Sequence, residues 1–261
     1  MIHKQFADKA VRILQADENV IGLAAAGSWL TNEMDEFSDL DLVLVTKEKI
    51  TGDKNNMLAY AKRLGEFLSG FTGEHVGEPR LLICLYDNPL IHVDIKFVTL
   101  QEFQTRIENP VILFERDKQL QTVLNTTVSE FPIPEYQWME DRFWTWVHYM
   151  LLKTGRGEYF EVYDGFGFLR RVIFGPLLHI KNKNLPRGVR RVETSLHKDD
   201  LNDLISTNAD YDRQSLLAAL KNCVKLYRKL RTELYDDKVI QNKKAEQKVI
   251  EYFDEIEKMK K

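Results

Sequence analysis

The chain has little that would support cysteine chemistry or insertion into a membrane. Its 261 residues include two cysteines, Cys84 and Cys223, each inside an apolar stretch. Neither a disulfide framework nor a cysteine metal site is expected from this pair, and two buried thiols are. The sequence also has no signal-like apolar segment at its start and no apolar run long enough to span a bilayer. These absences predict a cytoplasmic protein without a membrane partner.

An excess of positive charge is missing as well. The 37 lysines and arginines are outnumbered by 40 aspartates and glutamates, which gives a net charge of −3. Proteins that bind nucleic acid through bulk charge need a basic face, so a nucleic-acid partner is not expected. The histidines show no metal-ligand spacing. With 44% hydrophobic and 30% charged residues, the composition is that of a globular protein of one large or two modest domains.

The pattern of apolar residues changes in character partway along the chain. The first half mixes strand and helix signals, with strands expected over 20–26, 39–46, 80–86, 90–98 and 111–115, helices over 6–14 and 55–71, and a glycine-rich loop over 70–79. After Pro132-Ile133-Pro134, which reads as a stiff linker, helical periodicity dominates over 135–152, 159–180, 213–235 and 243–258. The sequence therefore predicts an α+β protein, with a mixed-sheet domain over 1–131 followed by an all-helical domain over 135–261.

Three aspartates stand out against their apolar surroundings. Asp39 and Asp41 begin the strand DLDLVLVT, and side-chain alternation points both the same way. Asp94 repeats the anomaly in the middle of IHVDIKF. Ionised carboxylates side by side repel each other and are costly to desolvate, unless a cation lies between them. Solvent-facing positions are the alternative. If all three share a face, they can bind Mg²⁺ ions, which prefer oxygen ligands.

A glycine-serine pair supplies a second element. Gly27-Ser28 follows the buried strand VIGLAAA, where a glycine allows close backbone approach and a hydroxyl with following amides can bind phosphate. Gly-Ser, then Asp-x-Asp on the next strand and an Asp on a later one, resembles the nucleotidyltransferase superfamily of the polymerase-beta type. The resemblance implies that Asp39, Asp41 and Asp94 are catalytic and bind Mg²⁺, and that Gly27 and Ser28 bind the nucleotide.

The layout of the whole chain carries a further resemblance. A catalytic domain followed by a helical one, and the segment 151–172 with its basic-Gly-Glu turn, look like the antibiotic nucleotidyltransferases, namely the lincosamide and aminoglycoside adenylyltransferases. By this resemblance Lys225 and Tyr227, on a C-terminal helix, contact ATP. The chain departs from many relatives after Gly-Ser, where it has Trp29-Leu30-Thr31 in place of an Arg-Gly pair.

The helical half offers candidate groups for a second substrate. Glu158 and Glu161 can bind a polar or cationic substrate, although acidic residues also favour the first turn of an ordinary helix. Aromatic residues at helical spacing can stack on a substrate ring or form core, and they are Trp138, Phe143, Trp144, Trp146 and Tyr149. Because small-molecule sites prefer domain interfaces, the acceptor is expected between the two domains.

These features predict a magnesium-dependent nucleotidyltransferase. It would move a nucleoside monophosphate, AMP from ATP by resemblance, to a hydroxyl of a small molecule such as an antibiotic, with release of pyrophosphate. Asp94 would accept the hydroxyl proton. Two alternatives remain open: a nucleotidyltransferase acting on a protein or a tRNA, as in toxin–antitoxin pairs, and a catalytically inactive nucleotide-binding protein.

Overall fold

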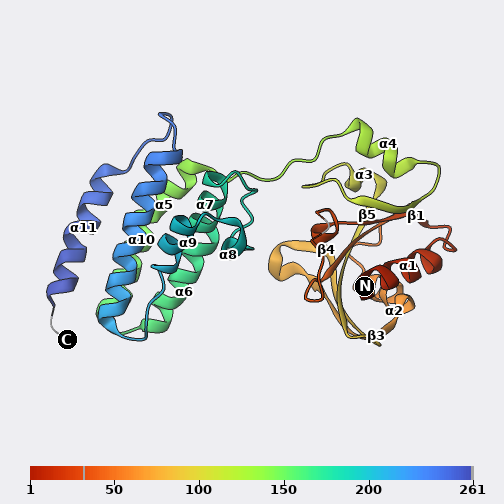
Figure 1. Ribbon diagram of the computed structural model, residues 1–261, viewed down its shortest axis with the longest axis horizontal. Coiled ribbons are helices and arrows are strands. Elements are labelled where there is room, and N and C mark those ends of the chain that lie inside the picture. The colour runs from red at the N-terminus through yellow and green to blue at the C-terminus, as the bar shows by residue number, and fades with distance from the viewer. Residues whose placement is uncertain (32, 260–261) are drawn as a thin grey trace. The chain divides into compact units, whose positions relative to one another are not determined.

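Two compact units make up the chain. The computed structural model describes residues 1–31 and 33–259 and divides into the units Met1–Phe131 and Pro132–Lys261 (Figure 1). The first unit contains all of the strands of the described chain and the second is helical. The fold class is therefore α+β, as the sequence predicts.

A six-stranded mixed sheet forms the middle of the first unit. Its strands are β1 (Val20–Ala25), β2 (Leu40–Thr46), β3 (Glu66–Gly73), β4 (Glu78–Asp87), β5 (Ile91–Thr99) and β6 (Val111–Glu115). They lie in the order β3-β4-β5-β2-β1-β6. The central neighbours β2 and β5 run parallel, and the other paired strands are antiparallel. The two strands that carry the candidate aspartates are thus neighbours in the centre of the sheet.

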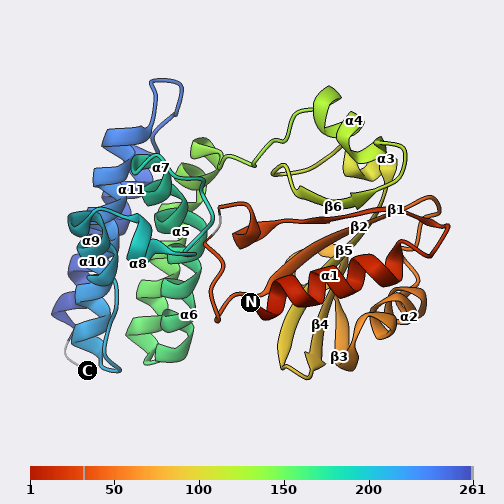
Figure 2. The same ribbon diagram turned by 45° about the vertical axis from the view of Figure 1, so that its right-hand side comes forward.

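The two faces of this sheet are covered differently. Helices α1 (Ile2–Leu14) and α2 (Lys54–Leu64) pack on one face, where alternate residues of the central strands are buried (Figure 2). The apolar residues of β2 on this face are Leu40, Leu42 and Leu44. On the opposite face, α3 (Leu100–Phe103) and α4 (Gln119–Thr126) build a smaller core around Val45 and Val98. That core occupies only the carboxyl ends of β2 and β5, away from their aspartates.

Two expectations for this unit are wrong. The helix expected over 55–71 ends at Leu64, and the chain then enters β3. The loop expected over 70–79 contains the end of β3, a short 3-10 turn η2 (Glu74–Val76) and the start of β4. The apolar spacing of β3 imitates a helix because this edge strand has no regular alternation of burial. Its conformation is set by hydrogen bonding to β4, along which it pairs from Glu66 to Gly73.

The second unit is built from helices around an aromatic core. Its elements are α5 (Tyr136–Arg156), α6 (Tyr159–Leu169), a π-helical turn η3 (Arg170–Phe174), α7 (Gly175–Lys181), α8 (Val192–Ser195), α9 (Lys198–Ile205), α10 (Arg213–Leu234) and α11 (Lys243–Lys258). Of the predicted aromatic cluster, Phe143 and Trp144 are buried in the core, whereas Trp138 and Tyr149 are exposed. Burial decides in favour of the core interpretation for the first two.

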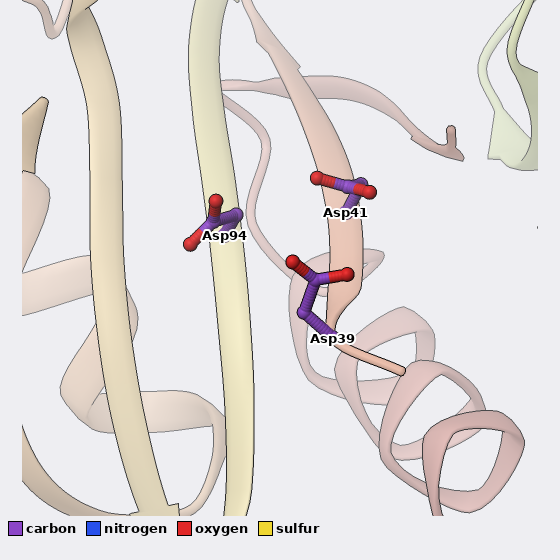
Figure 3. Close-up of side chains that lie close together, drawn as sticks. All are labelled: Asp39, Asp41 and Asp94. Atoms are coloured by element: carbon purple, nitrogen blue, oxygen red, sulfur yellow. The ribbon is translucent and has the colours of Figure 1, made fainter. Parts of the chain in front are cut away.

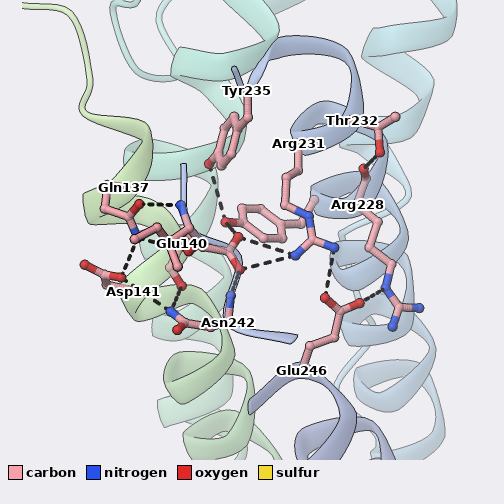
Figure 4. A network of polar contacts seen from close by, with 11 residues as sticks. Gln137, Glu140, Asp141, Arg228, Arg231, Thr232, Tyr235, Asn242 and Glu246 are labelled. Carbon is pink, nitrogen blue, oxygen red and sulfur yellow. Dashed lines mark hydrogen bonds and ion pairs between the residues drawn. The ribbon is translucent and has the colours of Figure 1, made fainter. Parts of the chain in front are cut away.

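One buried carboxylate joins three helices of this unit. Glu140 on α5 is fully buried, and it accepts hydrogen bonds from the Tyr227 hydroxyl at 2.7 Å and the Asn242 backbone N–H at 2.9 Å (Figure 4). The Arg231 guanidinium lies 3.3 Å from it and also pairs with Glu246 at 2.9 Å. A buried charge is tolerated when it is paired and hydrogen-bonded in this way. This network ties α5 to α10 and to the beginning of α11.

Two negative expectations concern cysteine and membranes. Cys84 and Cys223 are both free and buried, as expected, and burial raises the pKa of the Cys84 thiol to about 12. In the described part of the chain, no helix combines the length and the apolar character needed to cross a bilayer.

Candidate metal and nucleotide site

The three predicted carboxylates lie together on one face of the sheet. Asp41 on β2 and Asp94 on β5 are register partners across the parallel pair, so their side chains project from the same face. Asp39 directly precedes β2, and Leu40 between the two aspartates points into the core. One carboxylate oxygen from each residue lies within 4.8 Å of those of the other two, and all three residues are half-buried (Figure 3).

A hydrogen-bonded loop positions Asp39. The carbonyl of Ser38 accepts a hydrogen bond from Nε2 of the buried His3 on α1, at 2.6 Å. The hydroxyl of Ser38 in turn donates to Asp35 Oδ1 at 3.0 Å and accepts from the Asp35 N–H at 3.0 Å. The backbone before Asp39 is therefore held by α1 on one side and by an Asx-type turn on the other.

Gly27 lies directly against Asp41. Its φ is +61°, a left-handed conformation that favours glycine, and a Cβ at this position would lie 1.9 Å from Asp41 Oδ2. The preceding residue, Ala26, donates its N–H to the Asp41 carbonyl at 3.0 Å. Both the conformation and the space at this position thus exclude a side chain, which explains physically why a glycine follows β1.

The predicted turn after β1 is a 3-10 turn, η1 (Gly27–Trp29), with Ser28 half-buried inside it. The Gly27 N–H donates to Glu108 Oε1 at 2.9 Å. The expected nucleotide-binding pair therefore sits beside the carboxylates, with Gly27 in contact with one of them. The role of Gly27 and Ser28 in binding a nucleotide stays a prediction.

Two more side chains share the face of Asp94 by strand alternation. His92 Nε2 lies 2.9 Å from Asp94 Oδ1 and forms a hydrogen bond with it. Lys96 Nζ lies 2.8 Å from Glu78 Oε2, and Arg80 donates two hydrogen bonds to the same carboxylate. Burial of Glu78 opposes its ionisation, but the hydrogen bonds from Arg80 and Lys96 outweigh it and lower its pKa to about 2. Lys96 is thus already paired in this structure.

The carboxylate group has the chemistry of a metal site. Three carboxylates within this distance repel one another, and partial burial strengthens the repulsion. A divalent cation removes that repulsion, and hard oxygen donors are the ligands that Mg²⁺ and similar ions take. The residues present therefore fit a metal ion, and Asp39, Asp41 and Asp94 are the ones that can hold it.

The predicted nucleotide contacts in the helical unit need correction. Tyr227 is fully buried, with its ring stacked on Phe143 at a centroid distance of 3.7 Å and its hydroxyl bonded to Glu140. A side chain without exposed surface offers nothing to a nucleotide, so the prediction for Tyr227 is wrong in this structure. Lys225 is exposed, two residues earlier on α10. Residues two apart face different sides of a helix, so the two are not brought together.

The two candidate acceptor-binding glutamates lie next to each other around a lysine. Lys153 Nζ contacts the Glu158 carboxylate and lies 3.5 Å from Glu161 Oε2. The Tyr149 hydroxyl donates to Glu161 at 2.5 Å. The hydrogen bond to Glu158, helped by the nearby Glu161, raises the pKa of Lys153. Glu158 Oε1 also lies 3.7 Å from the Arg156 guanidinium. The side chains of Glu158 and Glu161 are 40% and 51% exposed, and their contact with an acceptor stays a prediction.

Glu108 is the neighbour of the site that sequence reasoning missed. It lies in the loop between α3 and β6, outside every motif, and only the pairing of β1 with β6 brings it to Gly27. His92 is different, because its alternation with Asp94 along one strand already places both on one face.

The chain is similar to several solved protein structures, but its sequence matches no known family. No family model matches the chain, and neither does any curated protein sequence. An aminoglycoside 6-adenyltransferase from Bacillus subtilis is 15% identical, with 98% of this chain and 99% of that one covered and a TM-score of 0.41. A nucleotidyltransferase-like protein from Exiguobacterium sibiricum is 13% identical, with 98% and 89% covered and a TM-score of 0.33.

A spectinomycin adenyltransferase from Enterococcus faecialis, solved with ATP and spectinomycin, is 12% identical, with 98% of this chain and 99% of that one covered and a TM-score of 0.31. These three likenesses have TM-scores of 0.31 to 0.41, which are too low to support an argument about the activity of this chain. Identities this low say nothing of a substrate, so the chemistry of this chain has to follow from its own residues.

Proposed function

We propose that the protein is a magnesium-dependent nucleotidyltransferase that moves AMP from ATP to a hydroxyl group of a small molecule and releases pyrophosphate. The observation that supports this most directly is the carboxylate group itself. Asp39, Asp41 and Asp94 converge within 4.8 Å beside the turn that begins with Gly27. Carboxylates held together next to a glycine turn suit a metal-bound triphosphate better than they suit a structural role.

Each residue has a defined task in this reaction. Asp39, Asp41 and Asp94 would hold Mg²⁺, which when bound neutralises charge on the phosphates and on the leaving pyrophosphate. Gly27 lets the backbone approach the phosphates, and Ser28 can donate its hydroxyl to them. The acceptor oxygen forms a bond to the α-phosphorus as the bond from that phosphorus to the pyrophosphate oxygen breaks. Asp94 takes the proton from the acceptor hydroxyl.

The acceptor in this proposal is a small molecule with a hydroxyl and a cationic group, as in an aminoglycoside. Glu158 and Glu161 support a cationic acceptor because their partly exposed carboxylates lie next to each other and already bind cations, the Lys153 ammonium and, at Glu158, the Arg156 guanidinium. An acceptor amine beside them would form charge-assisted hydrogen bonds. Replacing whichever of Glu158 and Glu161 contacts the acceptor by Gln should weaken acceptor binding by about 1.5–3 kcal/mol while sparing the nucleotide.

The decisive experiment measures pyrophosphate release. The protein would be incubated with ATP or GTP, with Mg²⁺ or with a chelator, against a panel of aminoglycosides, lincosamides and hydroxylated metabolites, and products would be checked by mass for one added nucleotidyl group. We expect magnesium-dependent release that requires an acceptor and is absent in Asp41→Asn. Release that persists in Asp41→Asn would contradict the site. Modification of a protein or tRNA and of no small molecule would contradict the acceptor.

A further inference from the structure

A fourth carboxylate lies at the edge of the candidate site and has no role in the reaction described above. Glu108 Oε1 accepts the N–H of Gly27 at 2.9 Å and is half-buried. It is not a member of the group of aspartates whose oxygens converge within 4.8 Å. Gly27, which donates this hydrogen bond, also contacts Asp41, so Glu108 lies near one carboxylate of the site. Like charges this near repel each other, and the hydrogen bond from Gly27 is a specific contact that offsets the repulsion.

The fold delivers Glu108 to this place by two fixed elements. Strand β6 pairs with β1 so that Val111 lies opposite Ala25, which sets the preceding loop beside the residue after Ala25, close to Gly27. The loop is held by Arg106, whose guanidinium donates to Asn109 Oδ1 at 2.8 Å and to the Thr127 carbonyl at 2.8 Å. Glu108 lies between these two anchors, so its carboxylate is placed by the scaffold.

The contact matters because of what Gly27 touches on its other side. The Gly27 α-carbon lies in contact with Asp41 Oδ2, since a Cβ at this position would lie only 1.9 Å from that oxygen. Fixing the Gly27 N–H fixes the plane of the peptide that joins Ala26 to Gly27, and Ala26 also donates to the Asp41 carbonyl. A continuous series of contacts therefore runs from Glu108 through Gly27 to the Asp41 carboxylate.

We propose that Glu108 is a positioning residue of the metal site, which orients Asp41 through the backbone of Gly27. The proposal rests on the proposed function in one respect, that Asp41 binds a metal ion. Its active feature is the hydrogen-bond acceptor and not the negative charge. Residues that orient metal ligands commonly change metal affinity when they are removed, although they never touch the ion.

Three variants separate the role of Glu108 as a hydrogen-bond acceptor from the effect of its negative charge. Glu108→Ala removes both, whereas Glu108→Gln removes the charge and keeps a carbonyl oxygen that can accept the Gly27 N–H. Glu115→Ala is the matched control, because Glu115 Oε2 also accepts a backbone N–H in the same unit, that of Gln121 at 2.9 Å, at the far end of β6. Thermal unfolding of each variant would show that it is folded.

The first measurement needs no metal. Amide hydrogen exchange at Gly27 in the metal-free protein should become faster in Glu108→Ala and stay slow in Glu108→Gln and Glu115→Ala, because protection from exchange follows the hydrogen bond.

The second measurement is the affinity for Mn²⁺ alone, by calorimetry or by electron paramagnetic resonance. Glu108→Ala should weaken it by about tenfold, at the lower end of the range for residues that orient metal ligands. The Gln and control variants should bind Mn²⁺ as the wild type does.

Each other outcome overturns the proposal. Equal loss of Mn²⁺ affinity in Glu108→Ala and Glu108→Gln would make Glu108 a ligand or an electrostatic partner of the ion. Tighter nucleotide binding in both, with Mn²⁺ affinity unchanged, would make Glu108 an anion that only occupies the place of a phosphate. Failure of the proposed function is recognised separately: if Asp41→Asn binds Mn²⁺ as the wild type does, the metal site itself is refuted, whatever the Gly27 amide shows.

Discussion

Asp41 and Asp94 face each other across the parallel pair β2–β5, at the same level of the sheet. Neighbouring strands lie about 4.8 Å apart, so two carboxylates paired in this way lie close together unless their side chains point in different directions. In this structure they do not turn away, and Asp39 joins them. The protein thus concentrates three carboxylates at one point of the sheet, and several measurable consequences follow from this geometry.

Removing one charge from the group should abolish function and raise stability. In Asp41→Asn we expect loss of pyrophosphate release, because the neutral amide is a poor ligand for Mg²⁺. Without metal, the variant should be more stable by up to about 1 kcal/mol, the scale for like charges opposite each other in a sheet. Asp8→Asn, at an exposed position on α1, is the control and should change neither property. A metal-free Asp41→Asn protein less stable than wild type would argue against repulsion.

Gly27 should tolerate no side chain, for two separable reasons. A residue with a Cβ is strained at φ +61°, and the Cβ would also lie 1.9 Å from Asp41 Oδ2. Gly77→Ala isolates the first reason, because Gly77 has φ +76° and no atom within 4 Å of an added Cβ. That control should cost about 1–2 kcal/mol of unfolding free energy. Gly27→Ala should cost more and should also weaken Mn²⁺ binding, and equal costs with intact Mn²⁺ binding would rule out the contact with Asp41.

The ion pairs of Glu78 should make stability depend on pH in acid. Its pKa is lowered to about 2 in the folded protein, from an ordinary value of 4.5. A lowered pKa means that its stabilising contribution is complete above about pH 4.5 and is lost as the pH falls towards 2. The difference in unfolding free energy between wild type and Glu78→Gln should therefore shrink over that range. Solvent screening keeps the effect small, and added salt should reduce it further.

The network around Glu140 should stabilise the helical unit without affecting the metal site. Glu140→Ala leaves Tyr227 and Arg231 without their buried acceptor, and breaking a buried pair costs about 3–5 kcal/mol. Asp141→Ala, at the exposed neighbouring position, should change stability little. Denaturant unfolding followed by tryptophan fluorescence suits the test, because Trp138, Trp144 and Trp146 lie in this unit. Loss of Mn²⁺ affinity in Glu140→Ala would contradict the assignment of the network to stability alone.

Part of the fold was readable from local patterns and part was not. Alternation along β2 and β5 placed the aspartates correctly, because the side-chain period of a strand is a property of the strand itself. The edge strand β3 was mistaken for the end of a helix, since Phe67, Leu68 and Phe71 are spaced as on a helix face. What holds this segment extended is its pairing with β4, a contact between residues that local periodicity does not describe.

For the candidate site, the sequence by itself indicated that Asp39 and Asp41 share one face of a strand and that Gly27 lets the backbone approach closely. Strand alternation and the backbone freedom of glycine act over only a few residues, so both can be predicted locally. The tertiary structure decided the rest. Tyr227 became a core residue because the helices of its unit pack around it, and an aromatic residue at helical spacing suits either a core or a site. Glu108 reached Gly27 from 81 residues away through the pairing of β1 with β6, and such long-range contacts are set by the packing of the whole domain.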